Sequence, residues 1–206
     1  MQDLPLTERP AELTERADAA GNRRRILAAA AGLFAQRDPE QVSMNDVACA
    51  AGVGMGTMYR RFGDRAGLTF ALLGERHRAF QDELLRGAPP LGPGAPPRER
   101  LHAFGRRSLE LLDGDARLLA AAGAQGSSTL GGPNVSYRVH LTLLLREAAP
   151  AIDAEYAAET LLAAFDPRLH LHLRHERGFS LRRIQDGWCV LCDGWLAAEG
   201  AGGAGT

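Results

Sequence analysis

Apolar residues in this 206-residue chain recur at spacings of three and four along almost its whole length. Such spacing places them on one face of an α-helix, whereas a half-buried strand would need strict alternation of apolar and polar residues. We find no sustained alternation bounded by turn residues, and alanine, leucine and arginine fill the intervening positions. The sequence therefore predicts an all-α protein.

A single Pro- and Gly-rich block, residues 87–97, divides the predicted helices into two groups. It holds five prolines and three glycines in eleven residues, which cannot continue a helix. The expected helices span 22–36, 44–51, 55–62 and 64–86, then 98–112, 115–122, 134–148, 153–177 (interrupted at Pro167) and 181–198, with Ser43, Asp64, Asn134 and Ser180 as caps. The expected domains are a flexible acidic lead (1–21), a helix-turn-helix domain (22–66), a second helical domain (67–198) and a flexible tail (199–206).

Residues 45–61 have the spacing of a helix-turn-helix. Ala48 is small enough for two helices to cross closely, and Gly52 can take the left-handed conformation that the turn needs. Val53 and Met58 are apolar and can pack the second helix onto the first. This geometry presents a recognition helix to the major groove of DNA, although an ordinary corner between two helices has the same pattern.

Four stretches around this motif resemble the tetracycline-repressor (TetR) family of bacterial regulators. They are Arg25–Phe34 (RILAAAAGLF), Val42–Ala48 (VSMNDVA), Ala51–Tyr59 (AGVGMGTMY) and Phe62–Leu68 (FGDRAGL). The resemblance implies an N-terminal helix-turn-helix domain that binds a DNA operator, followed by a helical domain for ligand binding and dimerisation.

The resemblance assigns DNA contacts to particular residues. Ser43 and Arg65 match residues that reach phosphates, and Thr57 and Tyr59 match a hydroxyl pair on the recognition helix. Hydroxyl groups there donate to phosphate oxygens and fix the helix in the groove without reading sequence. The remaining predicted contacts lie where base edges, the backbone or an adjacent minor groove come within reach: Met55, Gly56, Arg60, Arg61 and Arg25, the last within the run Arg23–Arg25. That run is equally well explained as a solvated helix start.

In the second domain the resemblance implies a small-molecule site and a dimer interface built from the last two long helices. For the effector we name residues on the middle helices: Phe80, Phe104, Tyr137 and His140. For the interface we name two apolar stripes: Leu161 and Phe165, and then Leu181, Ile184, Trp188, Leu191 and Trp195. An intramolecular core is the alternative for each stripe and for each effector residue.

The formal net charge of -1, taken alone, argues against a protein that binds nucleic acid through an overall positive charge. That value averages unlike regions: residues 22–65 carry seven arginines and four acids. The chain has no lysine, so every cationic contact with DNA falls to arginine. Without a signal-like start or an apolar run of about 18 residues, and with only three cysteines, we expect a cytoplasmic protein without membrane partners or a disulfide scaffold.

Two further patterns in the sequence are of kinds that can indicate catalysis or metal binding. Cys189 and Cys192 form a C-x-x-C without a second pair, which favours buried helix cysteines. His170, His172 and His175 lie close in sequence, but only the last two share a helix face and no acid matches them. We therefore expect no metal, no cofactor and no enzyme activity.

The function that these observations favour is a ligand-responsive transcriptional regulator. It would act as a repressor, bind a palindromic operator as a homodimer and be released by a small, partly apolar effector. A metal or thiol sensor and a nucleoid-type DNA-binding protein without a ligand are the alternatives.

Overall fold

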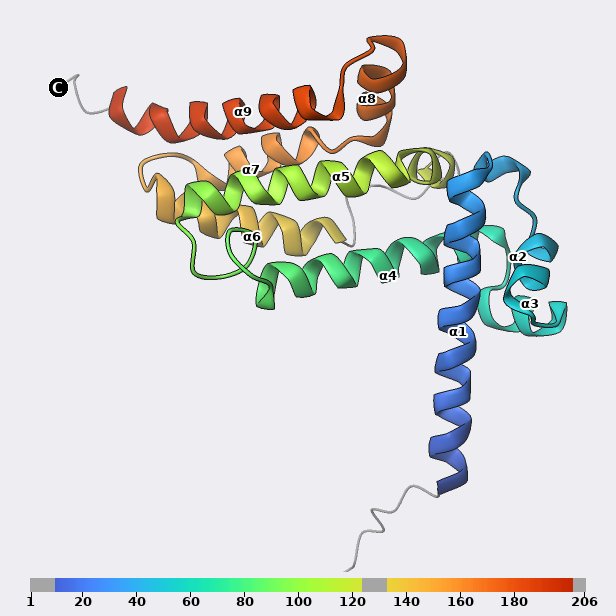
Figure 1. Cartoon of the computed structure of the whole chain (residues 1–206). Coiled ribbons are helices and arrows are strands. Elements are labelled where there is room, and N and C mark those ends of the chain that lie inside the picture. Colours follow the sequence, from blue (N-terminus) through green and yellow to red (C-terminus); the bar gives the residue numbers. More distant parts are fainter. Residues whose placement is uncertain (1–9, 124–132, 202–206) are drawn as a thin grey trace, which may run out of the picture. The chain divides into compact units, whose positions relative to one another are not determined.

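The computed structural model describes residues 10–123 and 133–201, and within these ranges all regular structure is helical (Figure 1). The predicted all-α class is therefore confirmed. The helices are α1 (Pro10–Gln36), α2 (Met44–Ala51), α3 (Met55–Phe62), α4 (Arg65–Arg86), α5 (Pro97–Gly123), α6 (Pro133–Ala148), α7 (Ala154–Ala163), α8 (Pro167–Leu171) and α9 (Leu181–Ala201), with a 3-10 turn η1 (Pro39–Gln41) and a π-helical turn η2 (His172–Glu176).

The chain divides into two compact units, which meet between Leu72 and Leu73. In the first unit α1 packs on α2, and α2 packs on α3. Ile26, Val47, Met58 and Leu68 each have an exposed fraction of 0% and form the centre of this small core. Each helix has another buried residue three or four positions away, namely Ala30, Met44, Phe62 and Leu72, so burial of one face of each helix holds the unit together.

The first helix begins at Pro10 and not at Asn22. Residues 10–21, which we expected to form part of a flexible lead, are helical. Alanine and glutamate are frequent in this segment and have high helix propensity, so the absence of an apolar core there was a poor guide to disorder. The Asp38–Pro39 pair ends the helix as expected, and Asp38 caps the following 3-10 turn.

The turns of the helix-turn-helix depend on two glycines. Gly52 ends α2 with a φ of 65°, and Gly63 ends α3 with a φ of 75°. Both angles lie in the region that residues with a Cβ rarely adopt. The predicted role of Gly52 as a left-handed turn residue agrees with this geometry.

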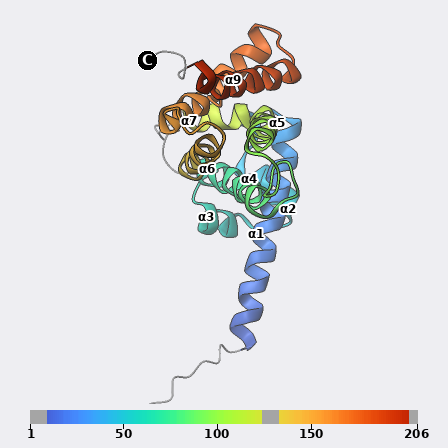
Figure 2. The same ribbon diagram turned by 90° about the vertical axis from the view of Figure 1, so that its left-hand side faces the viewer.

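In the second unit α5 lies beside α6, α8 and α9, and α6 packs along α7 (Figures 1 and 2). Trp188 of α9 is the largest fully buried side chain, and its Nε1 donates a 2.9 Å hydrogen bond to the Leu101 carbonyl in α5. A Cβ on Gly105 would lie 2.0 Å from that same Nε1. Gly105 therefore allows the indole to lie directly against the α5 backbone.

Two expectations about helices in this unit were wrong, whereas a third, the interruption of 153–177 at Pro167, is confirmed. One continuous helix, α5, replaces the two helices predicted at 98–112 and 115–122, because Gly114 is tolerated in its interior. Asn134 lies inside α6 and does not cap it, since the helix begins at Pro133. Residues 153–177 form α7, α8 and η2, because Pro167 takes the first position of a new helix that Asp166 caps.

The Pro- and Gly-rich block is described from end to end. It leaves α4 at Gly87 and enters α5 at Pro97, and Leu91 packs against the core of the second unit. A Gly- and Ser-rich segment that the sequence marks as a loop, residues 123–133, lies almost wholly outside the described residues, and so does most of the expected tail 199–206.

Candidate nucleic-acid interface

The third helix has one buried face and one exposed face. Met58 and Phe62, four residues apart, have exposed fractions of 0% and 8% and pack into the first unit. Gly56, Tyr59 and Arg60 are exposed, with Tyr59 at 54%. Half-buried Met55 and Thr57 lie between the two faces. The helix therefore presents a phenol, a guanidinium and a hydroxyl near its solvent side, which are groups that contact DNA phosphates and bases.

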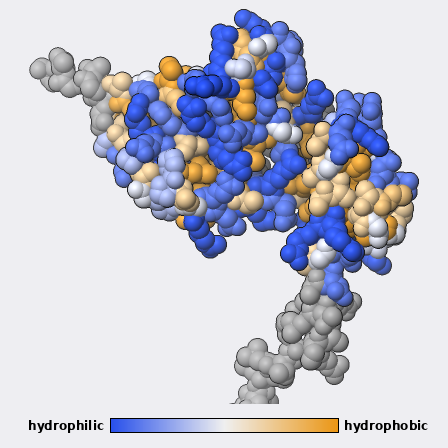
Figure 3. All heavy atoms as spheres, in the orientation of Figure 1, coloured by the Kyte–Doolittle hydropathy of each residue, from blue (hydrophilic) through white to orange (hydrophobic). Residues whose placement is uncertain are grey.

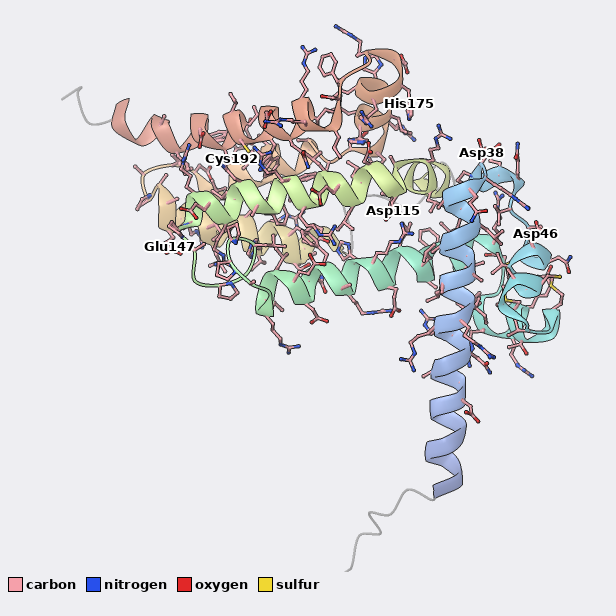
Figure 4. The ribbon with its side chains drawn as sticks, in the orientation of Figure 1. Asp38, Asp46, Asp115, Glu147, His175 and Cys192 are labelled. Carbon is pink, nitrogen blue, oxygen red and sulfur yellow. The ribbon has the colours of Figure 1, made fainter. Side chains whose placement is uncertain are left out.

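Ser43 fixes the start of α2 through a reciprocal pair of bonds with Asp46 (Figure 4). Ser43 Oγ accepts from the Asp46 N–H at 3.1 Å and donates to the Asp46 carboxylate at 2.7 Å, and that carboxylate also accepts from the Ser43 N–H at 2.9 Å. These bonds hold the pKa of Asp46 below its usual range. A phosphate contact by the Ser43 hydroxyl would have to replace its bond to Asp46.

Two of the predicted contact arginines bind their own unit. Arg65 donates to the carbonyls of Pro39 and Glu40 at 3.0 and 3.1 Å, which ties the first turn of α4 to η1. Arg61 donates to the carbonyl of Ala19 in α1. Both side chains hold helices together, and that structural role was not expected from the sequence.

The three arginines before the apolar part of α1, Arg23–Arg25, differ in their contacts. The guanidinium of Arg23 lies 5.6 Å from the ring centre of Phe62, a cation–π contact with the end of α3. Arg25 donates to the side chain of Asn22, one turn earlier. Arg24 and Arg25 are exposed. The contacts of Arg23 and Arg61 together attach residues 19–23 of α1 to the C-terminal end of α3.

Residues 26–72 match the family model of the bacterial regulatory proteins of the tetR family. The first unit therefore contains a helix-turn-helix domain that is similar to that of the TetR family. A 58-residue stretch is 45% identical to an HTH-type transcriptional regulator of Staphylococcus aureus, and a 61-residue stretch is 43% identical to an uncharacterised one of Mycobacterium tuberculosis. These matches cover 28% and 30% of this chain and 31% and 30% of the relatives, so they span about a third of the relatives' length.

Solved structures extend the similarity over both units of this chain. A TetR-family regulator of a Rhodococcus species is 24% identical, with a TM-score of 0.63 over 85% of this chain and 99% of that one. A transcriptional regulator of Pseudomonas aeruginosa PAO1 is 26% identical, with a TM-score of 0.62 over 87% and 92%. The likeness confirms the predicted TetR-like arrangement of an N-terminal helix-turn-helix and a C-terminal helical domain.

The four residues that we named for an effector come together in the second unit. The ring of Phe104 lies 5.7 Å from Phe80, 5.4 Å from Tyr137 and 5.6 Å from His140, measured between ring centres. Phe80 and Phe104 are fully buried, with exposed fractions of 1% and 0%. The cluster is thus part of the core, and an effector role for it stays a prediction.

Polar groups accompany these rings. The Tyr137 hydroxyl lies 2.9 Å from Nδ1 of His77, and burial raises the pKa of that hydroxyl above its usual value. Burial first, and the positive charge of Arg100 second, lower the pKa of His140 to about 4. His77, Arg100 and nearby Ser108 were missed by the sequence reasoning. Their spacing on α5 with Phe104, at positions 100, 104 and 108, was the signal that could have found the last two.

The residues named for a dimer interface fall into two groups. Leu161 and Trp188 have exposed fractions of 1% and 2%, so they belong to the core of one chain and offer no surface to a partner. Five remain at least partly accessible: Phe165, Leu181, Ile184, Leu191 and Trp195. Leu191 and its neighbour Val190 are 52% and 70% exposed. Hydrophobic atoms lie among hydrophilic ones over α9 in Figure 3.

The histidines and cysteines near the C-terminus have structural contacts. His170 is buried, with its Nε2 2.8 Å from Asp113, and His172 lies 2.8 Å from Glu176. Burial raises the pKa of the Cys192 thiol to about 12 (Figure 4). Within residues 10–123 and 133–201, no three His, Cys, Asp or Glu side chains lie close enough to hold a metal ion, and no helix is long and apolar enough to cross a membrane.

Proposed function

We propose that this chain is a transcriptional regulator that binds a palindromic DNA operator as a homodimer and is released by a small-molecule effector. The observation that supports DNA binding best is the exposed face of α3, where Tyr59 and Arg60 lie within a TetR-family helix-turn-helix. A single eight-residue helix reads few bases, so two copies about one helical turn of DNA apart give the required specificity.

Effector release would follow from linkage between the two units. The fourth helix is continuous from Arg65, which contacts η1, to Phe80, which lies in the aromatic cluster. A ligand that binds the second unit more tightly when the chain is free of DNA shifts the population away from the DNA-bound state. Ligand and operator then weaken each other's binding by the same factor.

DNA selection from a random pool, followed by a gel shift of the selected sequence and of the DNA upstream of this gene, tests the proposal. We expect a palindromic site bound by two chains, and loss of the shift when Thr57→Val and Tyr59→Phe are combined. Arg78→Gln is the matched control, because Arg78 is exposed on α4 and pairs with Glu75. Absence of selected or promoter binding at low salt would sink the idea.

A further inference from the structure

Three polar side-chain atoms are buried on α5 and α6, two helices of the second unit that pack together. They are Nε of Arg100, Oγ of Ser108 and Nε2 of His140, and none has a hydrogen-bond partner among the described residues. Buried polar atoms in native proteins nearly always have partners, because losing water without a replacement bond is costly. Three such atoms on two neighbouring helices therefore indicate groups prepared to bond to another molecule.

Arg100 and Ser108 lie on the same face of α5 as Phe104. Arg100, Phe104 and Ser108 succeed one another every four residues on α5, so they share a face of that helix. The ring of Phe104 lies 5.6 Å from that of His140, which shows that this face is turned toward α6. At a rise of about 1.5 Å per residue, Arg100 and Ser108 stand roughly 12 Å apart.

Arg100 lies at one end of this face of α5, and its contacts differ from those of a neighbouring arginine. Two residues before Arg100, Arg98 is held by the carboxylate of Asp193 through two hydrogen bonds of 2.8 Å. By contrast, Nε of Arg100 has no acceptor among the described residues. Burial keeps His140 neutral at pH 7, since its pKa is lowered to about 4. Arg100 is thus a cation beside a neutral imidazole, an arrangement that suits an anionic oxygen.

We propose that the second unit binds a small organic acid whose carboxylate pairs with Arg100 and accepts from His140. The apolar body of the acid lies against Phe104, and an oxygen at its far end bonds to Ser108. This inference rests on the effector-responsive function proposed above and names the chemical class of the effector.

Calorimetry with the full-length chain tests the charge requirement. The probes are 3-(4-hydroxyphenyl)propanoate, its primary amide, and 3-phenylpropanoate, which lacks the far hydroxyl. We expect the amide to bind at least tenfold more weakly than the acid. Arg100→Gln should reduce the affinity for the acid at least tenfold and remove the preference for it over the amide. Arg117→Gln, an exposed arginine on the same helix, should change neither affinity.

A second pair of measurements tests the far end of the site. Ser108→Ala should weaken binding of the hydroxylated acid severalfold and leave 3-phenylpropanoate unchanged. If Arg100→Gln does not fold, as judged by circular dichroism, Arg100→Lys replaces it and should retain the preference for the acid. Equal affinity for acid and amide in the wild-type protein, or no binding of a series of C4 to C12 carboxylates, would overturn the inference.

Failure of this inference and failure of the proposed function give different results. A protein that binds selected DNA and releases it with a neutral compound, but ignores carboxylates, retains the proposed function and loses the acid site. A protein that binds the acid but no DNA loses the proposed function, while its acid site stands.

Discussion

The ends of α2 in the first unit are set by neighbours in the sequence, whereas α5 and α9 in the second unit are joined by residues far apart. Ser43 and Asp46, three positions apart, start α2, and Gly52 ends it. In the second unit Trp188 bonds to the carbonyl of Leu101, 87 positions away. The ends of α2 can therefore be predicted from a short stretch of sequence. The packing of α5 on α9 depends on contacts between residues that are far apart in the sequence.

Ion pairs strengthen this contrast. Arg98 pairs with Asp193, Arg106 with Asp186 and Arg107 with Glu83, so α5 is tied to α9 and to α4. Arg76 of α4 also contacts Asp115, which is buried in α5 (Figure 4). Most of these pairs are partly exposed and each contributes little stability alone. Their value lies in fixing which helix faces which.

The largest expected effect breaks a long-range contact. Gly105→Ala should destabilise the second unit by about 2–4 kcal/mol, because the new Cβ would lie 2.0 Å from the Trp188 indole. Urea unfolding followed by tryptophan fluorescence reports this unit alone, since both tryptophans of the chain lie in α9.

Gly114→Ala on the same helix is the matched control. A Cβ there meets nothing within 4 Å, so the change should stabilise the protein by up to about 1 kcal/mol through helix propensity. Equal effects of the two substitutions would show that the indole does not need Gly105.

A smaller effect should follow from breaking a local turn. Gly52→Ala should cost the first unit about 1–2 kcal/mol, because a Cβ is disfavoured at a φ of 65° even though space is open. In urea, circular dichroism should show that part of the helix is lost at a lower urea concentration than in the wild type. The unfolding transition followed by tryptophan fluorescence should be unchanged. Gly32→Ala, in the open interior of α1, should instead be stabilising. A lower tryptophan midpoint in Gly52→Ala would contradict the separation of local and long-range contributions.

Removing the cap of α2 should have a similar or smaller effect. Ser43→Ala should destabilise the first unit by about 1 kcal/mol at pH 7, and Ser43→Thr should retain most of the stability. Because the pKa of Asp46 is lowered by these bonds, their contribution is complete above its unfolded value of about 3.9. The part that depends on the carboxylate is lost as pH falls through the lower folded value, so the difference between wild type and Ser43→Ala should narrow in acid, while the bond from the Asp46 N–H to Ser43 Oγ remains. A constant difference down to pH 2 would argue against this pairing.

The smallest effect expected is a pH dependence of the second unit. Burial lowers the pKa of His140 to about 4, so between about 6.5 and 4 the unfolded chain binds a proton that the folded chain does not. Stability should therefore fall as pH falls through this window. In unfolding followed by tryptophan fluorescence, His140→Gln should make stability depend less on pH. His175→Gln, which replaces an exposed histidine, should leave the pH dependence unchanged (Figure 4). An unchanged slope in His140→Gln would count against burial as the cause.

The sequence was a good guide where capping and turn residues decide the structure. Ser43, Gly52, Asp64 and Ser180 predicted the starts or ends of helices that the structure shows, as did the block at 87–97. Asn134 misled because a proline one position earlier begins the same helix. Local patterns therefore succeeded except where two start signals competed.

Contacts across the fold were predicted less well. The sequence indicated that Phe80, Phe104, Tyr137 and His140 lie on the middle helices, and these rings do meet. It did not show that Trp188 is buried within its own chain, because an apolar stripe has the same pattern in a core and in an interface. Nor did it show that Arg65 binds backbone carbonyls, since an arginine's partner is set by tertiary structure.

The central claim is that the exposed face of α3 binds DNA, and the salt dependence of operator binding tests it most directly. Fluorescence anisotropy with the selected palindrome should give a Kd that weakens linearly with salt on logarithmic axes. Arg60→Gln should weaken binding and reduce that slope by about 1 per chain if Arg60 contacts a phosphate, or relax the sequence preference if it contacts a base. Binding whose affinity, salt slope and sequence preference are all unchanged in Arg60→Gln would contradict the account.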